Sequence, residues 1–445
     1  MIENDAFKLL LINLFHLNPD DIANIFCTTF NKMMVLLVTL ADKHQACPYC
    51  GFTAPKIKEY VTKEITHSAL TTQKCIIKYR ARRYKCPCCG KTYYEFNPFV
   101  FKSQKISILT VHNILKDLKD FNETFTSVAR RYHVSPTSVS TIFDNHVDIG
   151  RNPLPEIINF DEVYAFKSEK SKYVCVLLDF KKQIPVDVLP NRKKEYLLNY
   201  FQKIPLEERK KVKYACSDMY EVYRDVVHKV FPCSCMLLDY FHLSQDFHRK
   251  MNEVRIKVMK GYKDDKASDE YYLLKKFNWL LFKNPEDEDK YGRLFDVERE
   301  RKYNSHFKSY MNYYDLRRKL LEINNNITIC YSLKLELVDF YSKSTIDNAQ
   351  VNLEHLIRSC IDTNIEEMIA FSNNLINWKQ EIINSFTIVG TEYKVEADKG
   401  QVVVCNKKVN NAIIENRNKI IKCIKNNANG YTNWSRFRNR VMYVL

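Results

Sequence analysis

Residues 157–166, reading IINFDEVYAF, constrain the fold of this chain more than any other stretch. The stretch is an apolar run with one carboxylate, Asp161, at its centre and Glu162 beside it. Because side chains alternate between the two faces of a strand, Asp161 and Glu162 are expected to point in opposite directions. A charge inside a buried strand is costly unless something compensates it, and a bound cation is the usual compensator. The stretch therefore predicts a buried strand whose carboxylate binds a cation.

Two further segments contribute one carboxylate each. KVKYACSDMY places Asp218 at the end of an apolar strand, and NNAIIENRNKIIKCIK places Glu415 on a helix. Taken singly, Asp218 could cap a helix that begins at Met219, and Glu415 could be a solvated helix residue. Taken together with the buried Asp161, the three carboxylates indicate a site for Mg²⁺ or Mn²⁺, since these ions prefer oxygen ligands. Such a site suits phosphoryl transfer on DNA.

The helix that carries Glu415 is predicted to be amphipathic. Its apolar face, suited to packing on a sheet, consists of Ile413, Ile420 and Ile424, widened by Ile414 and Ile421. Its polar face, suited to meeting metal and DNA, consists of Asn411, Glu415, Asn418 and Lys422.

The elements around Asp161 follow one another in a definite order. Strands are predicted at 157–166, 172–180, 183–190, 212–217 and 233–239, with helices at 193–204, at 219–230 and from Phe241 onward. A three-stranded meander followed by strand–helix units predicts a mixed sheet with helices packed on it. This order matches the ribonuclease H-like fold. Residues 259–400 are predicted to form a mainly helical insertion in this domain, with a small hairpin at 391–408.

Two cysteine knuckles predict a zinc module. CPYCG at 47–51 and CPCCG at 86–90 each present two thiolates, and two such turns complete a tetrahedral Zn²⁺ site. The predicted ligands are Cys47, Cys50, Cys86 and Cys89. Cys88 could replace Cys86 or Cys89, although the spacing of the outer pair is the one favoured.

Basic residues lie on the strand that precedes the second knuckle. KCIIKYRARRYKC could run along a phosphate backbone. Its predicted DNA-binding residues are Lys78, Arg80, Arg82 and Arg83.

Residues 124–147, TFTSVARRYHVSPTSVSTIFDNHV, have the pattern of a helix-turn-helix. The turn is predicted near 133–135, and Pro136 suits the first turn of the second helix. An ordinary helical hairpin would show the same pattern, but the basic charge and the neighbouring zinc module favour DNA binding. The residues predicted to contact DNA are Arg130, Arg131, Ser135, Thr137 and Ser138.

The net charge, the apolar runs and the cysteines of the chain indicate which partners and which compartment to expect. The net charge of +16 favours a polyanionic partner, either nucleic acid or an anionic membrane surface. The apolar runs are shorter than the roughly 18 residues that a membrane span needs, so insertion into a membrane is not expected, and DNA rather than a membrane is the expected partner. Fifteen cysteines, of which only five cluster, indicate reduced thiols and a metal site in the cytoplasm.

A chain of 445 residues is too long for a single core. The expected organisation is multidomain α+β. The predicted parts are an N-terminal helical segment (1–43), the zinc module (44–98), the helix-turn-helix (99–152), a ribonuclease H-like catalytic domain (153–258), the helical insertion (259–400), and the final catalytic helix with the C-terminal tail (401–445).

Several motifs together resemble bacterial insertion-sequence transposases of the DDE type, in the branch with a zinc finger, a helix-turn-helix and a helical insertion. The motifs are CPYCG…RRYKCPCCGKTYYE, NFDEVYAF, VDVLPNRKKE, SDMYEVY, LDYFHL and NNAIIENRNKIIKCIKNNANGY. The resemblance departs at Asn416, where a small residue is more usual, and at Asn426, where the family tends to be basic.

The resemblance implies a function and a site. Asp161, Asp218 and Glu415 would be the catalytic triad, using Mg²⁺ or Mn²⁺ to cleave DNA at the element's ends and to transfer the freed 3′-OH to target DNA. His242 matches a recurrent family position and is either a residue that supports the site or contacts DNA, or a core histidine. A homodimer on double-stranded DNA, associated with the bacterial nucleoid, is also expected from the resemblance.

Three alternatives remain open at this stage. A sequence-specific DNA-binding regulator would need only the first 150 or so residues and would tolerate loss of the carboxylates. A nuclease of the same fold would cut strands without joining them. A structural zinc protein would leave the net charge of +16 without an explanation.

Overall fold

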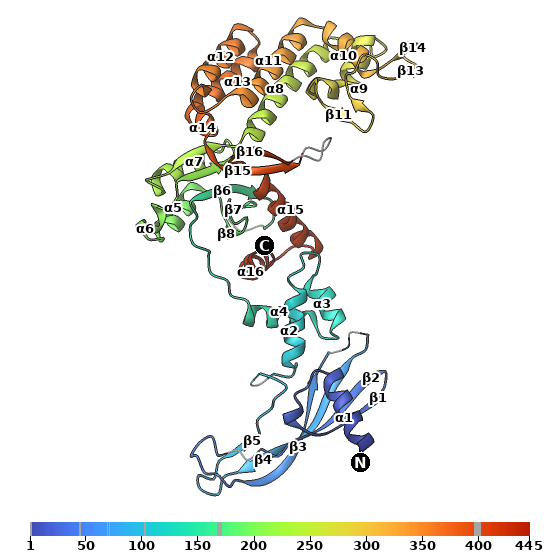
Figure 1. Ribbon diagram of the computed structural model, residues 1–445, viewed down its shortest axis with the longest axis vertical. Coiled ribbons are helices and arrows are strands. Elements are labelled where there is room, and N and C mark those ends of the chain that lie inside the picture. The colour runs from blue at the N-terminus through green and yellow to red at the C-terminus, as the bar shows by residue number, and fades with distance from the viewer. Residues whose placement is uncertain are drawn as a thin grey trace. The chain divides into compact units, whose positions relative to one another are not determined.

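The computed structural model describes residues 2–43, 46–68, 70, 72–101, 104–166, 171–395 and 402–445. The chain forms two compact units, whose elements are labelled in Figure 1. Unit 1 comprises residues 1–150, 164–167 and 419–445, and unit 2 comprises residues 151–163 and 168–418. Within the described ranges, no helix combines the length and the apolar character that a membrane crossing requires.

A five-stranded sheet forms the first part of unit 1. Its strands are β1 (Ile22–Phe30), β2 (Met33–Leu40), β3 (Lys56–Thr66), β4 (Cys75–Lys85) and β5 (Thr92–Tyr94). The order is β1-β2-β4-β3, and β5 pairs with β4. Helix α1 (Ile2–Leu14) buries Leu11 and Ile12 in a core that also contains Leu36 and Ile77 of the sheet.

The predicted helices in residues 1–43 are correct only for α1. From Ile22 onward the prediction is wrong, because β1 and β2 pair as an antiparallel hairpin that runs from Ile22↔Leu40 to Phe30↔Met33. A short apolar run does not by itself distinguish a helix from a strand. In this chain the run forms a strand because β4 offers it a partner, and β2 pairs in parallel with β4.

The second part of unit 1 is helical. Its helices are α2 (Ile108–Asp117), α3 (Phe125–Arg131), α4 (Pro136–His146) and α16 (Trp434–Val444). The hydroxyls of Thr124 and Ser135 accept hydrogen bonds from backbone N–H groups in the first turns of α3 and α4, respectively. Pro136 occupies the first turn of α4, where a missing N–H costs nothing. The predicted pair of helices with a short turn is therefore present.

The C-terminal helix α16 packs on these helices. The side chain of Arg440 is 1% exposed and donates to the backbone carbonyls of Asp120 and Glu123, at 2.8 Å each. Tyr443 meets Phe143 of α4 edge to face. The predicted domain boundaries placed 401–445 with the catalytic domain, whereas residues 419–445 belong to unit 1. Periodicity alone does not reveal which core an amphipathic helix joins.

A second five-stranded sheet forms the centre of unit 2. Its strands are β6 (Ile157–Val163), β7 (Val174–Asp179), β8 (Pro185–Leu189), β9 (Tyr214–Ser217) and β10 (Cys235–Leu238). The order is β10-β9-β6-β7-β8, in which β6, β7 and β8 are antiparallel neighbours and β9 and β10 run parallel to β6. The mixed sheet that the sequence predicted is thus confirmed.

Helices bury the faces of this sheet. Three helices follow the strands as α5 (Lys194–Gln202), α6 (Leu206–Arg209) and α7 (Glu221–Val230). Phe160 of β6 packs with Phe201 of α5 and Tyr223 of α7 in one core. On the opposite side, Ile157 and Cys216 are buried near Ile413, which belongs to helix α15 (Ala412–Asn427).

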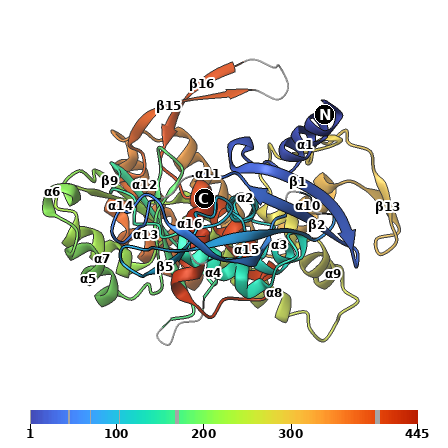
Figure 2. The same cartoon turned by 90° about the horizontal axis from the view of Figure 1, so that it is seen from below.

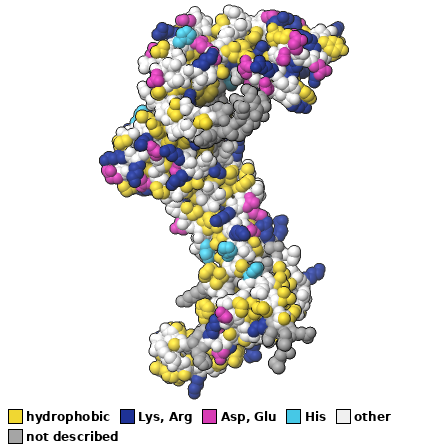
Figure 3. Space-filling view, in the orientation of Figure 1, with side chains coloured by type: hydrophobic (Ala, Val, Ile, Leu, Met, Phe, Trp, Pro, Cys, Tyr) yellow, Lys and Arg dark blue, Asp and Glu magenta, His cyan; other side chains and the backbone are white. Residues whose placement is uncertain are grey.

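Residues 240–408 contain further helices with a core of their own. They are α8 (Tyr240–Lys260), α9 (Asp269–Lys276), α10 (Tyr313–Glu322), α11 (Asn325–Lys343), α12 (Ala349–Asp362), α13 (Glu366–Asn377) and α14 (Lys379–Asn384). Strands β15 (Ile388–Val395) and β16 (Val402–Lys408) form the predicted hairpin, visible in Figure 2. On the face shown in Figure 3, basic and acidic side chains are interspersed over the helices, so the charge there is mixed.

Candidate functional site

The parallel strands of unit 2 bring three carboxylates to one edge of the sheet. Asp161 lies on β6, Asp218 directly follows β9, and Asp239 directly follows β10. The register pairs Asn159 with Cys216 and Ser217 with Leu238. Continuing this register places Asp161, Asp218 and Asp239 at the same level, and residues at one level of a parallel sheet point to the same face. The carboxyl ends of such strands are a common place for binding sites.

Helix α15 is fixed against β6 by buried amides. The side chain of Asn411 accepts a hydrogen bond of 2.7 Å from the amide of Asn159 and donates to the carbonyl of Phe160 at 3.3 Å. One turn further on, a carboxylate oxygen of Glu415 lies within 4.8 Å of ligand atoms of Asp239 and His242. One more turn on, the amide of Asn418 donates to Oδ2 of Asp161 at 2.7 Å.

These contacts show how the polar face predicted for α15 is used. Asn411 and Asn418, which the sequence placed on that face with Glu415 and Lys422, are 0% and 5% exposed. Asn418 follows Asn411 by two turns, so it lies on the same face, together with the buried Ile414. Polar residues are buried here because β6 offers polar partners, which helical periodicity cannot reveal.

The environment of Asp161 disfavours its charge in the absence of a cation. Burial and the neighbouring carboxylate of Asp218 raise the pKa of Asp161 to about 7. The adjacent Glu162 is bound differently, since it pairs with Arg192 and accepts a hydrogen bond from the Tyr223 hydroxyl at 3.3 Å. The prediction that Asp161 and Glu162 make separate contacts is consistent with this arrangement.

His242, on the first turn of α8, lies among the carboxylates. Its Nε2 is 3.8 Å from Oδ2 of Asp239 and 3.8 Å from Oε1 of Glu415. Asp239 is 4% exposed, and burial raises its pKa while the charge of His242 opposes that rise. Burial likewise raises the pKa of Asp218, again opposed by His242. The structure thus places His242 in the candidate site.

The residues at this edge fit a divalent cation. Oδ1 of Asp218, Oδ2 of Asp239 and Nε2 of His242 are buried atoms without a hydrogen-bond partner among the described residues. Unpaired buried acceptors are costly, and a cation would satisfy them. Oxygen donors of this kind suit Mg²⁺ or Mn²⁺. A groove of about 710 Å³ opens beside Asp218 and His242, with Gln245 and Arg249 also in its wall.

Sequence reasoning gave neither Asn418 nor Asp239 a role of its own in this site. It placed Asn418 on the polar face of its helix, which was expected to meet metal and DNA, and it did not assign Asp239 to the metal. A signal for Asp239 was available, because it ends an apolar strand in the same way as Asp218. The sequence also allowed this strand end to lie beside Asp218 and close to the metals, and the parallel pairing of β10 with β9 places it beside Asp218.

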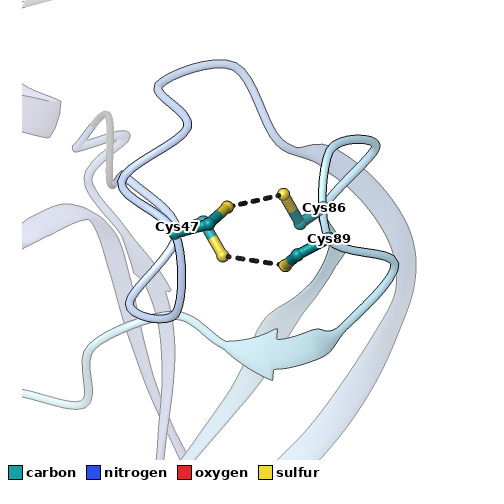
Figure 4. Close-up of side chains that lie close together, drawn as sticks. Cys47, Cys86 and Cys89 are labelled. Carbon is teal, nitrogen blue, oxygen red and sulfur yellow. Dashed lines mark hydrogen bonds between the residues drawn. The ribbon is translucent and has the colours of Figure 1, made fainter.

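Unit 1 contains a second candidate metal centre, made by four cysteines. The Sγ atoms of Cys47 and Cys89 are 3.7 Å apart, and those of Cys50 and Cys86 are 3.5 Å apart. Figure 4 shows the thiols of the two turns facing one another. Cys88 is exposed and lies outside this group of four. Four converging sulfurs are compatible with tetrahedral Zn²⁺.

The two cysteine turns are brought together by a hairpin. β3 and β4 pair from Lys56↔Lys85, so the start of β3 and the end of β4 meet. The 35 residues between Cys50 and Cys86 therefore return to the point where they began. The N–H of Gly51 bonds to the carbonyl of Cys47, and that of Gly90 to Cys86, at 2.9 Å each. Both glycines have positive φ, which favours glycine in these tight turns.

Two of the predicted DNA-binding arginines are held inside unit 1. The guanidinium of Arg82 pairs with Glu95 at 3.0 Å and also donates to the carbonyl of Leu40. Arg131 pairs with both Asp117 and Glu123. The carboxylates of unit 1 therefore already pair with both guanidinium groups, of which Arg82 is 15% exposed and Arg131 is 38% exposed.

The other predicted DNA-binding residues lie at or near the surface of unit 1. Lys78 and Arg83 pair with Glu64 and Glu59 at the surface. Exposed residues are Arg80, Arg130, Ser135 and Thr137, and Ser138 is partly exposed. The oxygen of Ser135 accepts the N–H of Ser138, so this serine also caps α4.

Two comparisons with known proteins bear on these sites. A family model described as a transposase, of the ISL3 DDE type, matches residues 158–397, more than half of the chain. The chain is 19% identical over 392 residues to the transposase for insertion sequence element IS1001 of Bordetella parapertussis. That match covers 87% of this chain and 86% of the relative. The family match includes Asp161, Asp218, Asp239 and His242 and ends before Glu415.

Proposed function

Because this chain belongs to the ISL3-type family of DDE transposases, we propose that it cleaves DNA at the ends of a mobile element and joins the freed 3′-OH to target DNA. The sheet of unit 2 supports this proposal. A three-stranded meander continued by two parallel strands is the arrangement expected of a ribonuclease H-like catalytic domain. In this proposal Asp161, Asp218 and Glu415 are the catalytic residues.

The observation that supports the proposal is that Asp161 of β6 and the residue after β9, Asp218, lie at one level of the sheet, with Glu415 of α15 near enough to raise the pKa of Asp161. Two divalent cations held by these carboxylates would activate the attacking oxygen and stabilise the leaving oxygen of an in-line displacement. Asp161 and Asp218 supply fixed negative charge from the sheet, and Glu415 supplies it from α15. The amide of Asn418 fixes the rotamer of Asp161 through its 2.7 Å hydrogen bond.

The burial of these groups has a chemical consequence. Without a cation, the raised pKa of Asp161 shows that burial and Asp218 oppose its ionisation. The site therefore takes up cations while releasing protons, which makes binding stronger at higher pH. The groove beside Asp218 and His242 would admit the phosphodiester to be cut.

We assign recognition of the element's ends to unit 1. Its zinc module, with Cys47, Cys50, Cys86 and Cys89 as ligands, holds the ends of β3 and β4 together. Exposed Arg80 on β4 and Arg130 on α3 would contact phosphates, whereas the N-terminal turn of α4 would approach base edges. Two ends must be synapsed in transposition, so a homodimer bound to DNA in the cytoplasm is part of the proposal.

A strand-transfer assay with full-length protein tests this function. A labelled duplex that carries the terminal sequence flanking the gene, with a free 3′-OH, is incubated with supercoiled plasmid and Mg²⁺ or Mn²⁺. We expect covalent joining of the labelled 3′ end to the plasmid and complete loss of joining in EDTA. Cleavage without joining would indicate a nuclease, and DNA binding without either reaction would indicate a regulator.

A further inference from the structure

We propose that Asp239 and His242 are metal ligands that, together with Glu415, hold one of the two cations of the site. This inference deepens the proposed function and rests on it. It enlarges the ligand set from the three carboxylates that the sequence indicated to four carboxylates and one imidazole.

The first argument is the position of Asp239 in the sheet. Asp239 follows β10 at the level that Asp218 occupies after β9 and Asp161 occupies on β6, as the parallel registers show. The backbone N–H of Asp239 bonds to the carbonyl of Ser217 at 3.1 Å, which continues the pairing beyond the strand end. The side chain of Asp239 therefore projects to the same face as the two catalytic aspartates.

The second argument is that Oδ2 of Asp239 is buried and unsatisfied. The residue is 4% exposed, and within the described part of the chain this oxygen has no hydrogen-bond partner. Asp239 stands at the N-cap position of α8, where burial raises its pKa and the backbone N–H groups of Phe241 and Asn411 favour its charged form and oppose that rise, but its Oδ2 has no hydrogen-bond partner among the described residues. A buried carboxylate oxygen of this kind needs a positive partner. The N-cap position by itself gives Oδ2 of Asp239 no such partner among the described residues.

The third argument is the distance to His242. Nε2 of His242 is 3.8 Å from Oδ2 of Asp239 and 3.8 Å from Oε1 of Glu415. Both distances exceed the range of a hydrogen bond. The three donor atoms lie within 4.8 Å of one another, a separation that one shared cation could bridge.

The cation held by Asp239, His242 and Glu415 would have a different set of ligand atoms from the cation held by Asp161 and Asp218. Carboxylates alone suit Mg²⁺, whereas an imidazole nitrogen is a better ligand for transition metals than for Mg²⁺. Manganese accepts both donor types, so the position formed by Asp239, His242 and Glu415 should prefer Mn²⁺ to Mg²⁺. The position formed by Asp161 and Asp218 should show less preference.

Mn²⁺ binding to the full-length protein without DNA tests the inference, with electron paramagnetic resonance to count bound ions and pulsed measurements to detect nitrogen coordination. We expect about two bound Mn²⁺ per chain in the wild type, one of them with a directly coordinated nitrogen. His242→Gln should lose the nitrogen signal. Asp239→Asn should weaken binding of that ion by about tenfold or more.

A matched control and a folding control make the result interpretable. Asp179→Asn should bind Mn²⁺ like the wild type, because Asp179 also ends a strand but its Oδ1 accepts the N–H groups of Lys181 and Lys182 in a turn. Far-ultraviolet circular dichroism checks that each variant is folded. Should Asp239→Asn fail to fold, His242→Gln decides alone, since its side chain is 24% exposed and its replacement leaves the sheet core intact.

A nitrogen signal that persists in His242→Gln, or wild-type Mn²⁺ affinity in folded Asp239→Asn, would overturn the inference. Strand cleavage by Asp161→Asn is measured in parallel. If Asp161→Asn is inactive while Asp239→Asn binds Mn²⁺ normally, only the enlarged ligand set fails. If Asp161→Asn cleaves DNA normally, the proposed function itself fails.

Discussion

Asp161 illustrates how one residue links the fold to the chemistry. Burial and Asp218 raise its pKa from 3.8 to about 7 in the metal-free protein. Since the folded-state pKa lies above the unfolded value, the stability that this carboxyl contributes is fully present below pH 4 or so and is lost as the pH rises through about 7. Above that pH the ionised Asp161 destabilises the metal-free fold by at most about 4 kcal/mol.

Replacing Asp161 by Asn should therefore stabilise the metal-free protein at pH 8. We expect Asp161→Asn to unfold at a higher temperature than the wild type in EDTA and to lose most of the stabilisation that Mn²⁺ gives the wild type. Differential scanning calorimetry at pH 5 and pH 8 measures both effects, and the difference between the proteins should shrink at pH 5. A wild type that is the more stable protein in EDTA at pH 8 would show that Asp161 is satisfied without metal.

Asn418 is expected to act by positioning Asp161. Asn418→Ala removes the N–H that holds Oδ2 of Asp161 and should lower the cleavage rate by about 10- to 100-fold, with DNA affinity unchanged. Asn416→Ala, at an exposed position on the same helix, serves as the control. If Asn418→Ala and Asn416→Ala cleave DNA at equal rates in a single-turnover assay, Asn418 does not position Asp161.

At the scale of elements, local sequence predicted the strands and helices of unit 2 well. Apolar runs such as VCVLLD and turn residues at their ends delimit β7 and its neighbours, and the order of elements determined which strands could be adjacent. Prediction from local sequence failed where the structure of a segment depends on residues far away in the chain. β1 and β2 depend on β4, the buried side of α15 depends on Asn159 and Asp161, and the place of Asp239 depends on pairing with β9.

The proposed zinc ligands can be tested within the cluster formed by Cys47, Cys50, Cys86 and Cys89. Cys47→Ser should reduce the zinc content from about one ion per chain to near zero and should weaken DNA binding. Cys88→Ser, at an exposed cysteine of the second turn that is not an assigned ligand, is the control and should retain zinc. Elemental analysis measures the zinc content, and fluorescence anisotropy with labelled DNA measures the binding. Full zinc content in Cys47→Ser would refute the assigned ligand set.

For the whole molecule, the net charge of +16 predicts binding to DNA that weakens steeply with salt. Arg130→Ala should reduce affinity and lower the slope of log affinity against log salt by about one, since Arg130 is exposed on α3. Arg131→Ala should chiefly lower the melting temperature, because Arg131 pairs with Asp117 and Glu123. Fluorescence anisotropy measures the affinity and thermal melts measure the stability. Loss of affinity in Arg131→Ala together with a lower melting temperature in Arg130→Ala would contradict the roles given to these two arginines.

The central claim is that Asp161, Asp218 and Glu415 form one metal-dependent catalytic site. The most direct measurement is cleavage of a labelled duplex carrying the element's end by Asp161→Asn, Asp218→Asn and Glu415→Gln, with Mg²⁺ or Mn²⁺ and with EDTA. Each substitution keeps the shape of the side chain and removes the charge that holds a cation. We predict that all three variants bind DNA like the wild type and do not cleave it, whereas Asp179→Asn cleaves. Cleavage by Glu415→Gln at the wild-type rate, or cleavage that survives EDTA, would contradict the claim.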